Sequence, residues 1–128
     1  MGRDAEESHS WSKELSAGPR TAAEARWFLR EALADQDVDL DTDAAMLLAS
    51  EVASNAAKHG REPIALSISI EEQGLRVSVF DRGEGFDPES LDVSGRETGG
   101  WGLRLLNDLS SEWGVDRKPD GTEVWFRV

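Results

Sequence analysis

The sequence predicts an α+β fold, a two-layer sandwich in which helices lie on one face of a mainly antiparallel, mixed sheet. Segments with apolar residues three and four positions apart predict amphipathic helices. Segments in which apolar and polar residues alternate predict strands with one buried face. Short polar turns between neighbouring strands favour antiparallel hairpins. No internal repeat interrupts this pattern.

The composition limits the kinds of partner. The chain has 128 residues, enough for one domain with a substantial core. Its 26 acidic and 14 basic residues give a net charge of −12, which disfavours nucleic acids and anionic bilayers. It has no cysteine, which excludes disulfides and thiolate metal sites. Because no apolar stretch is long enough for a signal sequence or a membrane span, we expect an intracellular, cytoplasmic protein.

The N-terminal segment predicts an arm and a strand. Residues 1–10 are mostly polar and are expected to form a flexible arm, so that the folded domain covers residues 11–128. Alternation from Trp11 to Leu15 predicts a short strand at the edge of the sheet.

Two helices are predicted next. Thr21 and Glu24 have the spacing of a capping box before a helix over residues 21–34. An acidic linker then supplies the N-cap of a second helix over residues 41–59. Gly60 is the expected C-terminal capping residue of that helix.

A hairpin follows the second helix. Apolar residues alternate with small polar ones over residues 64–70 and again over 75–79, with a turn between the two strands. By the same period of two, Asp81 points to the buried face of the second strand. A carboxylate on that face is costly without a partner, so Asp81 is expected at the mouth of a crevice between helices and sheet.

The C-terminal part predicts a loop, a helix and a second hairpin. Residues 82–99 are rich in glycine and lack a period, which is typical of a functional lid or a disordered loop. A helix is predicted over residues 101–110. Strands over residues 113–117 and 122–128 then form a hairpin, with alternate apolar residues of the last strand on one face. The helix is expected to bury Leu103, Leu106 and Leu109.

The second helix carries a polar stripe formed by Glu51, Asn55 and His59, which are spaced four residues apart on one face. The stripe lies about 100° from the apolar line of the same helix, from 3.6 residues per turn. Asn55 offers an oxygen to a cation such as Mg²⁺, which takes other ligands from phosphates and water. Glu51, one turn away, could orient or deprotonate an attacking water or hydroxyl near the terminal phosphate.

Further nucleotide contacts are predicted where strands and helices begin or end. Asp81 could accept a hydrogen bond from an exocyclic amine, which selects adenine, and Gly83 and Gly85 would let the backbone approach the base. The Thr122 hydroxyl can point into the same crevice. The glycines before the third helix expose amides at its positive end, which suits phosphate oxygens. These glycines are Gly99, Gly100 and Gly102.

Ordinary structural roles remain open for single residues. His59 is favoured at a helix C-terminus by the helix dipole alone. Glu51 alone is typical of a solvated helix face, and Trp101 of a packing residue. A Gly-x-Gly pair alone is weak evidence. Four polar or glycine-rich elements at junctions between regular segments together indicate a nucleotide site.

In chain order these motifs resemble those of the GHKL ATPases. Glu51-x-x-x-Asn55 resembles the N box, Asp81-x-Gly83-x-Gly85 the first glycine box, Gly100-x-Gly102 the second, and Gly121-Thr122 the last motif. Within that superfamily the chain is similar to the short bacterial anti-sigma-factor serine/threonine kinases. The resemblance extends over residues 15–128.

The resemblance implies an ATP-binding two-layer fold in which Asn55 holds Mg²⁺, Asp81 reads adenine and Glu51 is the general base. In such proteins the ATP-bound form sequesters a sigma factor and phosphorylates a serine on a STAS-type antagonist, and a homodimer is common. Arg96 is a candidate for the arginine that contacts the terminal phosphate. The other implied nucleotide contacts are His59, Gly83, Gly85, Gly99, Gly100, Trp101, Gly102, Leu103 and Thr122.

Two functions remain open from the sequence. The first is a protein serine kinase that is also an anti-sigma factor, which the presence of Glu51 favours. The second is a non-catalytic binding module that uses ATP as a structural ligand, which the uncertain match of Arg96 favours. The catalytic domain of a histidine kinase fits less well, because neither His9 nor His59 lies in a plausible phosphoacceptor helix pair.

Overall fold

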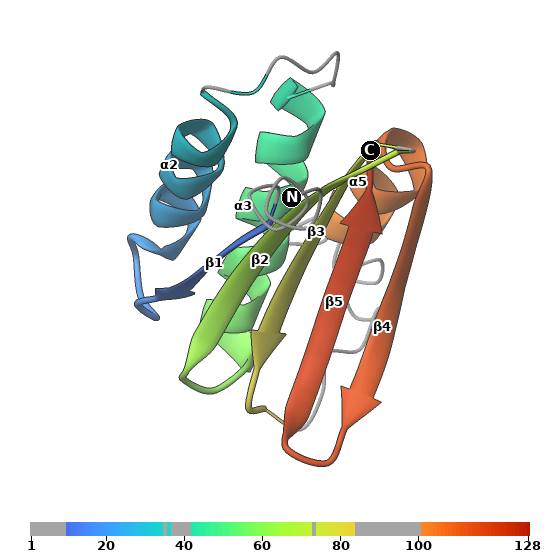
Figure 1. The fold of residues 1–128 in the computed structure, drawn as a ribbon. Coiled ribbons are helices and arrows are strands. Elements are labelled where there is room, and N and C mark those ends of the chain that lie inside the picture. The colour runs from blue at the N-terminus through green and yellow to red at the C-terminus, as the bar shows by residue number, and fades with distance from the viewer. Residues whose placement is uncertain (1–9, 35, 37–41, 73, 84–100) are drawn as a thin grey trace, which may run out of the picture.

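The computed structural model describes residues 10–34, 36, 42–72, 74–83 and 101–128. Within these residues the chain forms a sheet with helices packed against one face, as Figure 1 shows. The elements in chain order are β1 (Ser10–Leu15), α2 (Thr21–Leu33), α3 (Thr42–His59), β2 (Ile64–Glu71), β3 (Gly74–Asp81), α5 (Trp101–Leu109), β4 (Glu112–Lys118) and β5 (Gly121–Arg127).

The strand order is β1-β2-β3-β5-β4, and each neighbouring pair is antiparallel. The predicted antiparallel sheet and the edge position of β1 are therefore confirmed, and no parallel pair occurs among the described strands. β3 is the central strand. Its last residue, Asp81, lies opposite Thr122 at the start of β5.

One face of the sheet carries the core. α2 packs on α3, α3 packs on β2 and β3, and α5 contacts α3 and β4. Burial of this apolar face is the main favourable term in the stability of such a domain. The largest fully buried side chains include Leu15, Leu29, Leu48, Ile64, Leu66, Ile68, Leu75, Val77, Val79, Leu106 and Phe126. Their alternation along the strands confirms the predicted inward faces, including that of Val124 and Phe126.

The start of α2 differs from the predicted capping box. The N-cap residue is Arg20, which makes no side-chain cap hydrogen bond. Thr21 is the first helical residue, and its hydroxyl donates to the carbonyl oxygens of Ser16 at 2.5 Å and Gly18 at 2.9 Å. The Glu24 carboxylate accepts from the Ser16 N–H at 2.9 Å. Both polar side chains therefore bond to the loop between β1 and α2.

The third helix ends one residue earlier than predicted, and its last residue is not buried. Leu106 is fully buried in the core, as predicted. Leu109 is 37% exposed, which corrects the expectation that it packs inward. Leu109 is three positions beyond Leu106, and at the final turn of a nine-residue helix the neighbouring layer no longer covers it. No helix in the described ranges is long and apolar enough to cross a membrane.

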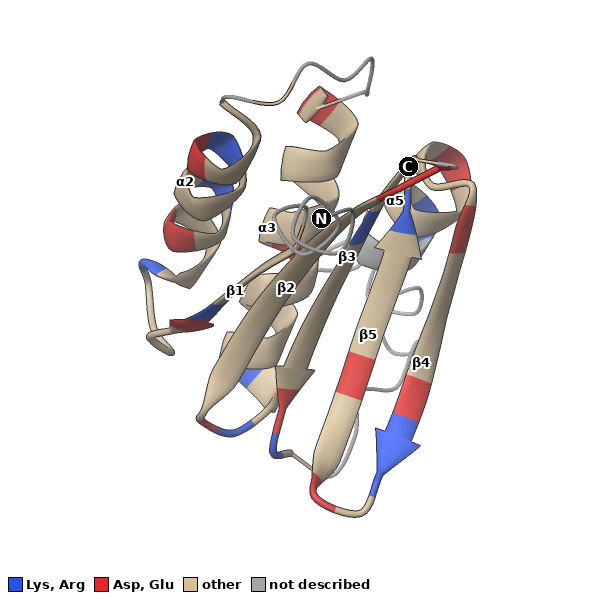
Figure 2. Ribbon diagram, in the orientation of Figure 1, with Lys and Arg blue, Asp and Glu red and all other residues tan. Residues whose placement is uncertain are grey.

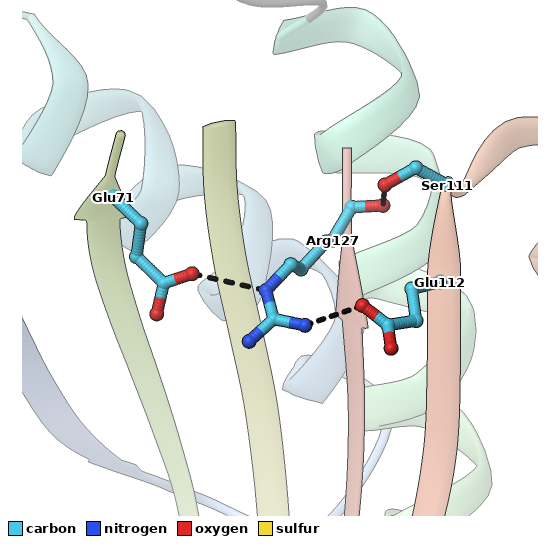
Figure 3. Close-up of polar contacts among 4 residues, drawn as sticks. All are labelled: Glu71, Ser111, Glu112 and Arg127. Carbon is cyan, nitrogen blue, oxygen red and sulfur yellow. Dashed lines mark hydrogen bonds and ion pairs between the residues drawn. The ribbon is translucent and has the colours of Figure 1, made fainter. Parts of the chain in front are cut away.

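Arg127 joins three strands at the end of the sheet away from Asp81 (Figure 3). Its Nε donates to Glu71 at 2.9 Å, and a second guanidinium nitrogen donates to Glu112 at 2.5 Å. The side-chain hydrogen bonds to Glu71 and then Glu112 raise the pKa of Arg127 above its ordinary value. The Arg127 carbonyl also accepts from the Ser111 backbone N–H at 2.8 Å. The charges of Arg127, Glu71 and Glu112 are therefore paired with one another within the protein.

Candidate functional site

A small hollow lies between the C-terminal half of α3 and the neighbouring ends of β3 and β5. Its volume is about 10 Å³, comparable with the space that one water requires. The sequence predicted a crevice at this junction, with Asp81 at its mouth. The residues that line the hollow are Val52, Asn55, Ala56, His59, Gly60, Val79, Asp81 and Val124.

Asp81 is the buried acid of this hollow, with only 6% of its surface exposed. Its Oδ1 accepts a hydrogen bond of 2.5 Å from the Gly83 N–H and a longer one of 3.4 Å from the Arg61 N–H. No donor among the described residues is bonded to Oδ2. A buried carboxylate with one oxygen held by the backbone and the other available is suited to accept a ligand's N–H donor.

Three glycines pack around Asp81. A Cβ at Gly60 would lie 2.7 Å from Asp81 Oδ2, and a Cβ at Gly83 would lie 2.7 Å from Oδ1. A Cβ at Gly121 would overlap the backbone oxygen of Asp81. Since real Cβ contacts are longer, any side chain here would displace the carboxylate or its strand. At Gly83 the structure shows a close approach to Asp81, and the predicted approach of its backbone to a base stays a prediction.

Gly60 differs from the predicted helix-capping residue. It follows α3 as predicted, and its N–H donates to the Ala56 carbonyl at 2.8 Å. A helix-ending glycine commonly has a positive φ, but the glycines with positive φ in the described chain are Gly18 and Gly74. The need for glycine at position 60 is therefore steric, because Asp81 occupies the space that a Cβ would take.

Thr122 carries the strongest sign of a ligand. The residue is 1% exposed, and its Oγ1 is the one buried side-chain polar atom of the described residues without a hydrogen-bond partner. A buried hydroxyl without a partner costs about 1–3 kcal/mol, so such a group calls for an explanation. Thr122 is paired with Asp81 across the two strands. A ligand bound at Asp81 would lie beside this hydroxyl and could supply its missing hydrogen-bond partner.

The polar stripe of α3 is only partly brought to the hollow. Asn55 is buried, lines the hollow, and donates through Nδ2 to the Glu51 backbone oxygen at 3.0 Å. This bond uses the amide nitrogen and leaves the amide oxygen Oδ1 as an acceptor that can serve a cation. His59 is exposed but also lines the hollow. Glu51 is half-buried and does not line it, and its carboxylate has no hydrogen bond or ion pair in the described part of the molecule.

The other predicted contacts belong to the glycine-rich segment. Gly85, Arg96, Gly99 and Gly100 lie outside the described residues, as do most of the predicted lid, most of the acidic linker and nearly all of the N-terminal arm. Trp101, Gly102 and Leu103 form the first turn of α5, which begins where the sequence predicts. Backbone N–H groups of a first helical turn have no partner within the helix and suit phosphate oxygens.

The residues fit an adenine nucleotide with its cation. Asp81 supplies an acceptor, and Thr122, which pairs with Asp81 but does not itself line the hollow, supplies an unpaired hydroxyl. The glycines at positions 60, 83 and 121 leave room for the Asp81 carboxylate and its strand. Asn55 supplies one neutral oxygen, and Mg²⁺ commonly takes the rest of its ligands from phosphates and water. No group of three His, Asp or Glu residues in the described ranges could hold a metal ion. The contact of Gly60 and Arg61 with Asp81 was not predicted from the sequence, because no local sequence pattern indicates it.

Comparison with known proteins places the chain in a family. The model of the histidine kinase-like ATPase domain matches residues 15–128. Among curated proteins none matches significantly. Two solved structures share the fold: the histidine kinase domain of a blue-light-activated kinase from Erythrobacter litoralis, and the catalytic domain of the histidine kinase ThkA.

The similarity in sequence to these two structures is low, and they bear on the fold alone. The Erythrobacter domain is 23% identical with a TM-score of 0.55, and the match covers 84% of this chain and 58% of that domain. The chain thus spans less than two thirds of that domain. The ThkA domain is 17% identical with a TM-score of 0.54, over 92% of this chain and 95% of that one. The family model covers most of the chain and the shared fold agrees with it: the chain belongs to the histidine kinase-like ATPase domains, a family of ATP-binding domains.

Proposed function

We propose that the chain is an ATP-dependent anti-sigma factor and protein serine/threonine kinase, which sequesters a sigma factor and phosphorylates a serine of a STAS-type antagonist. The observation that carries the nucleotide part is the pairing of Asp81 with Thr122, whose hydroxyl lacks a partner. The anti-sigma part rests on the order of motifs along the chain. Such a protein would act in the cytoplasm as a homodimer.

Adenine would meet the hollow at Asp81, through its exocyclic amine. That amine would donate to Asp81 Oδ2, and Thr122 Oγ1 would bond to a ring nitrogen or a bridging water. Guanine presents a carbonyl oxygen at the equivalent position, which would face the Asp81 carboxylate without a proton between them. A buried acceptor left without its donor is a strong basis for rejecting the wrong base.

Glu51 is the proposed general base. In the transfer step the serine oxygen forms a bond to the γ-phosphorus, the bond from that phosphorus to the β,γ-bridging oxygen breaks, and ADP leaves. The serine proton passes to the Glu51 carboxylate. Because that carboxylate is half-buried and makes no ion pair among the described residues, it is available to take the proton. Asn55, one turn further along α3, would hold Mg²⁺ against the phosphates.

The test is phosphate transfer to candidate STAS proteins, measured with labelled ATP for the wild type and Glu51→Gln. We expect Glu51→Gln to retain ATP binding and to lower transfer by about 10²–10⁴-fold, the usual contribution of a general base. Glu31→Gln, which changes an exposed carboxylate of α2, is the matched control and should transfer normally.

The outcomes separate the two functions left open by the sequence. Transfer at the wild-type rate by Glu51→Gln would show that another group is the base. ATP-dependent sequestration of a sigma factor by a wild type that transfers no phosphate to any antagonist would favour the non-catalytic binding module.

A further inference from the structure

A second groove lies next to the Asp81 hollow, at the end of the sheet where β3 and β4 finish and β5 begins. It has a volume of about 550 Å³ and is formed by the α3–β2 connection, the residues after β3 and the β4–β5 turn. Figure 2 shows basic segments in the α3–β2 connection, after β3 and at the end of β4. We call it the basic groove, after the basic side chains of Arg61, Arg82, Arg117 and Lys118 that line it.

The charge of the basic groove is opposite to that of the whole protein. Four basic and two acidic side chains line it, whereas the chain as a whole has a net charge of −12. One of the two acids, Glu62, accepts a hydrogen bond from the Ala17 N–H of the β1–α2 loop at 3.1 Å. Lys118 has a loose ion pair with Glu123 at 3.7 Å and is 46% exposed. The groove therefore offers positive charge to a ligand.

Arg61 and Arg82 are the most available of these cations. Both residues are exposed, and within the described ranges neither guanidinium makes a hydrogen bond or an ion pair. Arg127 at the other end of the sheet is the contrast, since two carboxylates bind it. Exposed arginine without an internal partner is enriched where a protein binds another.

The backbone of the basic groove is bonded to the nucleotide site. The Arg61 N–H donates to Asp81 Oδ1, and the Arg82 N–H donates to the Arg61 carbonyl at 3.0 Å. Gly83, whose N–H also holds Asp81, lines the groove. A ligand that fixes these two arginines would therefore fix the backbone that orients Asp81.

We propose that the basic groove docks a short acidic segment of a protein partner, and that docking tightens ATP binding through Asp81. A nucleic acid would extend beyond the groove and meet the acidic remainder of the surface. A single phosphate would engage only part of a groove whose cations come from two connections and the end of β4. An acidic peptide segment matches both its size and its charge. The inference goes beyond the proposed function, because it requires neither kinase activity nor a sigma factor.

The test uses a fluorescent oligoglutamate peptide, titrated into the full chain at low salt, with an oligoglutamine peptide of equal length for comparison. We expect the oligoglutamate peptide alone to bind, and its affinity to fall as salt rises. Arg61→Glu and Arg82→Glu should each weaken it by about tenfold, since each replaces attraction by repulsion. Arg26→Glu, the same change at an exposed position of α2, should bind as the wild type does.

Titration of ATP with and without saturating peptide tests the coupling. We expect ATP to bind about fivefold more tightly with peptide, the lower end of typical allosteric coupling. Thermal melting first checks that all variants are folded. Absence of peptide binding, or an equal loss in Arg26→Glu, would overturn the docking groove. An ATP affinity unaffected by peptide would overturn the coupling. Loss of ATP binding by Arg82→Glu without peptide would show instead that the groove holds the nucleotide's phosphates, which leaves the ATP assignment intact.

Discussion

At one end of the sheet Arg127 is bonded to Glu71 and Glu112. At the other end Asp81 and Thr122 are buried, and each has a side-chain oxygen without a hydrogen-bond partner among the described residues. Both ends bring together polar groups from different strands of the sheet. The Arg127 cluster is partly exposed, so water could solvate its groups even without their partners. Thr122 has no such alternative, because it is buried.

This difference shows which polar groups indicate a ligand-binding site. A satisfied ion pair at an exposed strand end adds little to stability and indicates no ligand. A buried hydroxyl without a partner lowers stability, and the protein tolerates that cost where a ligand can supply the partner. Substitutions at the Asp81 end should therefore change ATP affinity, whereas substitutions at the Arg127 end should not.

The largest effect is expected for Asp81→Asn. The amide can still accept from the Gly83 N–H, so the fold is retained, but its NH₂ group can face the exocyclic amine of adenine, donor against donor. We expect ATP affinity to fall by about 100-fold. Calorimetric titration of ATP and GTP measures it, and the wild type should reject GTP. Equal wild-type affinity for the two nucleotides would remove the adenine assignment.

The second-largest effect is expected for Gly60→Ala. The added methyl group overlaps the Asp81 carboxylate, so we expect a loss of about 1–3 kcal/mol in unfolding free energy, as in overpacked cores, together with weaker ATP binding. Denaturant unfolding measures the first effect. The control is the same change in an Asp81→Ala background, where the cost should largely disappear. An undiminished cost there would show that Gly60 acts on something other than Asp81.

Thr122→Val tests the buried hydroxyl. Removal of the unpaired oxygen should leave unfolding free energy unchanged or raise it by about 1 kcal/mol, while ATP affinity falls by about tenfold. Thr21→Val is the matched control, because Thr21 is equally buried but its hydroxyl is bonded to Ser16 and Gly18. That variant should lose stability. A loss of similar size in Thr122→Val would mean that the Thr122 hydroxyl does have a partner in the free protein.

The smallest effect is expected for Arg127→Met. Its ion pairs are partly exposed, so we expect a decrease of at most a few degrees in melting temperature and no change in ATP affinity. Thermal melting and calorimetry measure the two quantities. A marked loss of ATP binding would show that the two ends of the sheet are not independent.

Most of the fold could be predicted because it depends on local periodicity. The alternation in β2 and β3 gives the buried face, and the same period places Asp81 inward at the end of β3. Helical spacing gives α2 and α3 to within one or two residues. These patterns survive because burial of one face dominates the stability of each element.

The remaining features depend on contacts between distant segments. Gly60 meets Asp81 only after α3 packs on β3, so the sequence suggested a capping role instead. The Thr21 hydroxyl is bonded to the preceding loop, and helix-capping patterns do not predict the path of that loop. The unpaired state of the Thr122 hydroxyl and the basic groove also follow from tertiary packing alone. The roles of Glu51, Arg96 and the other predicted contacts stay predictions.

The glycine packing around Asp81 also constrains how this chain could change over generations. Every other amino acid begins with a Cβ atom, which is the atom that collides at Gly60 and Gly121. Chemical similarity therefore offers no mild replacement at these two positions, whereas Arg127 could exchange for several polar residues with little loss. In a library of random variants, these two positions should be among the least permissive of the whole domain, although neither glycine has a side chain with which to touch the nucleotide.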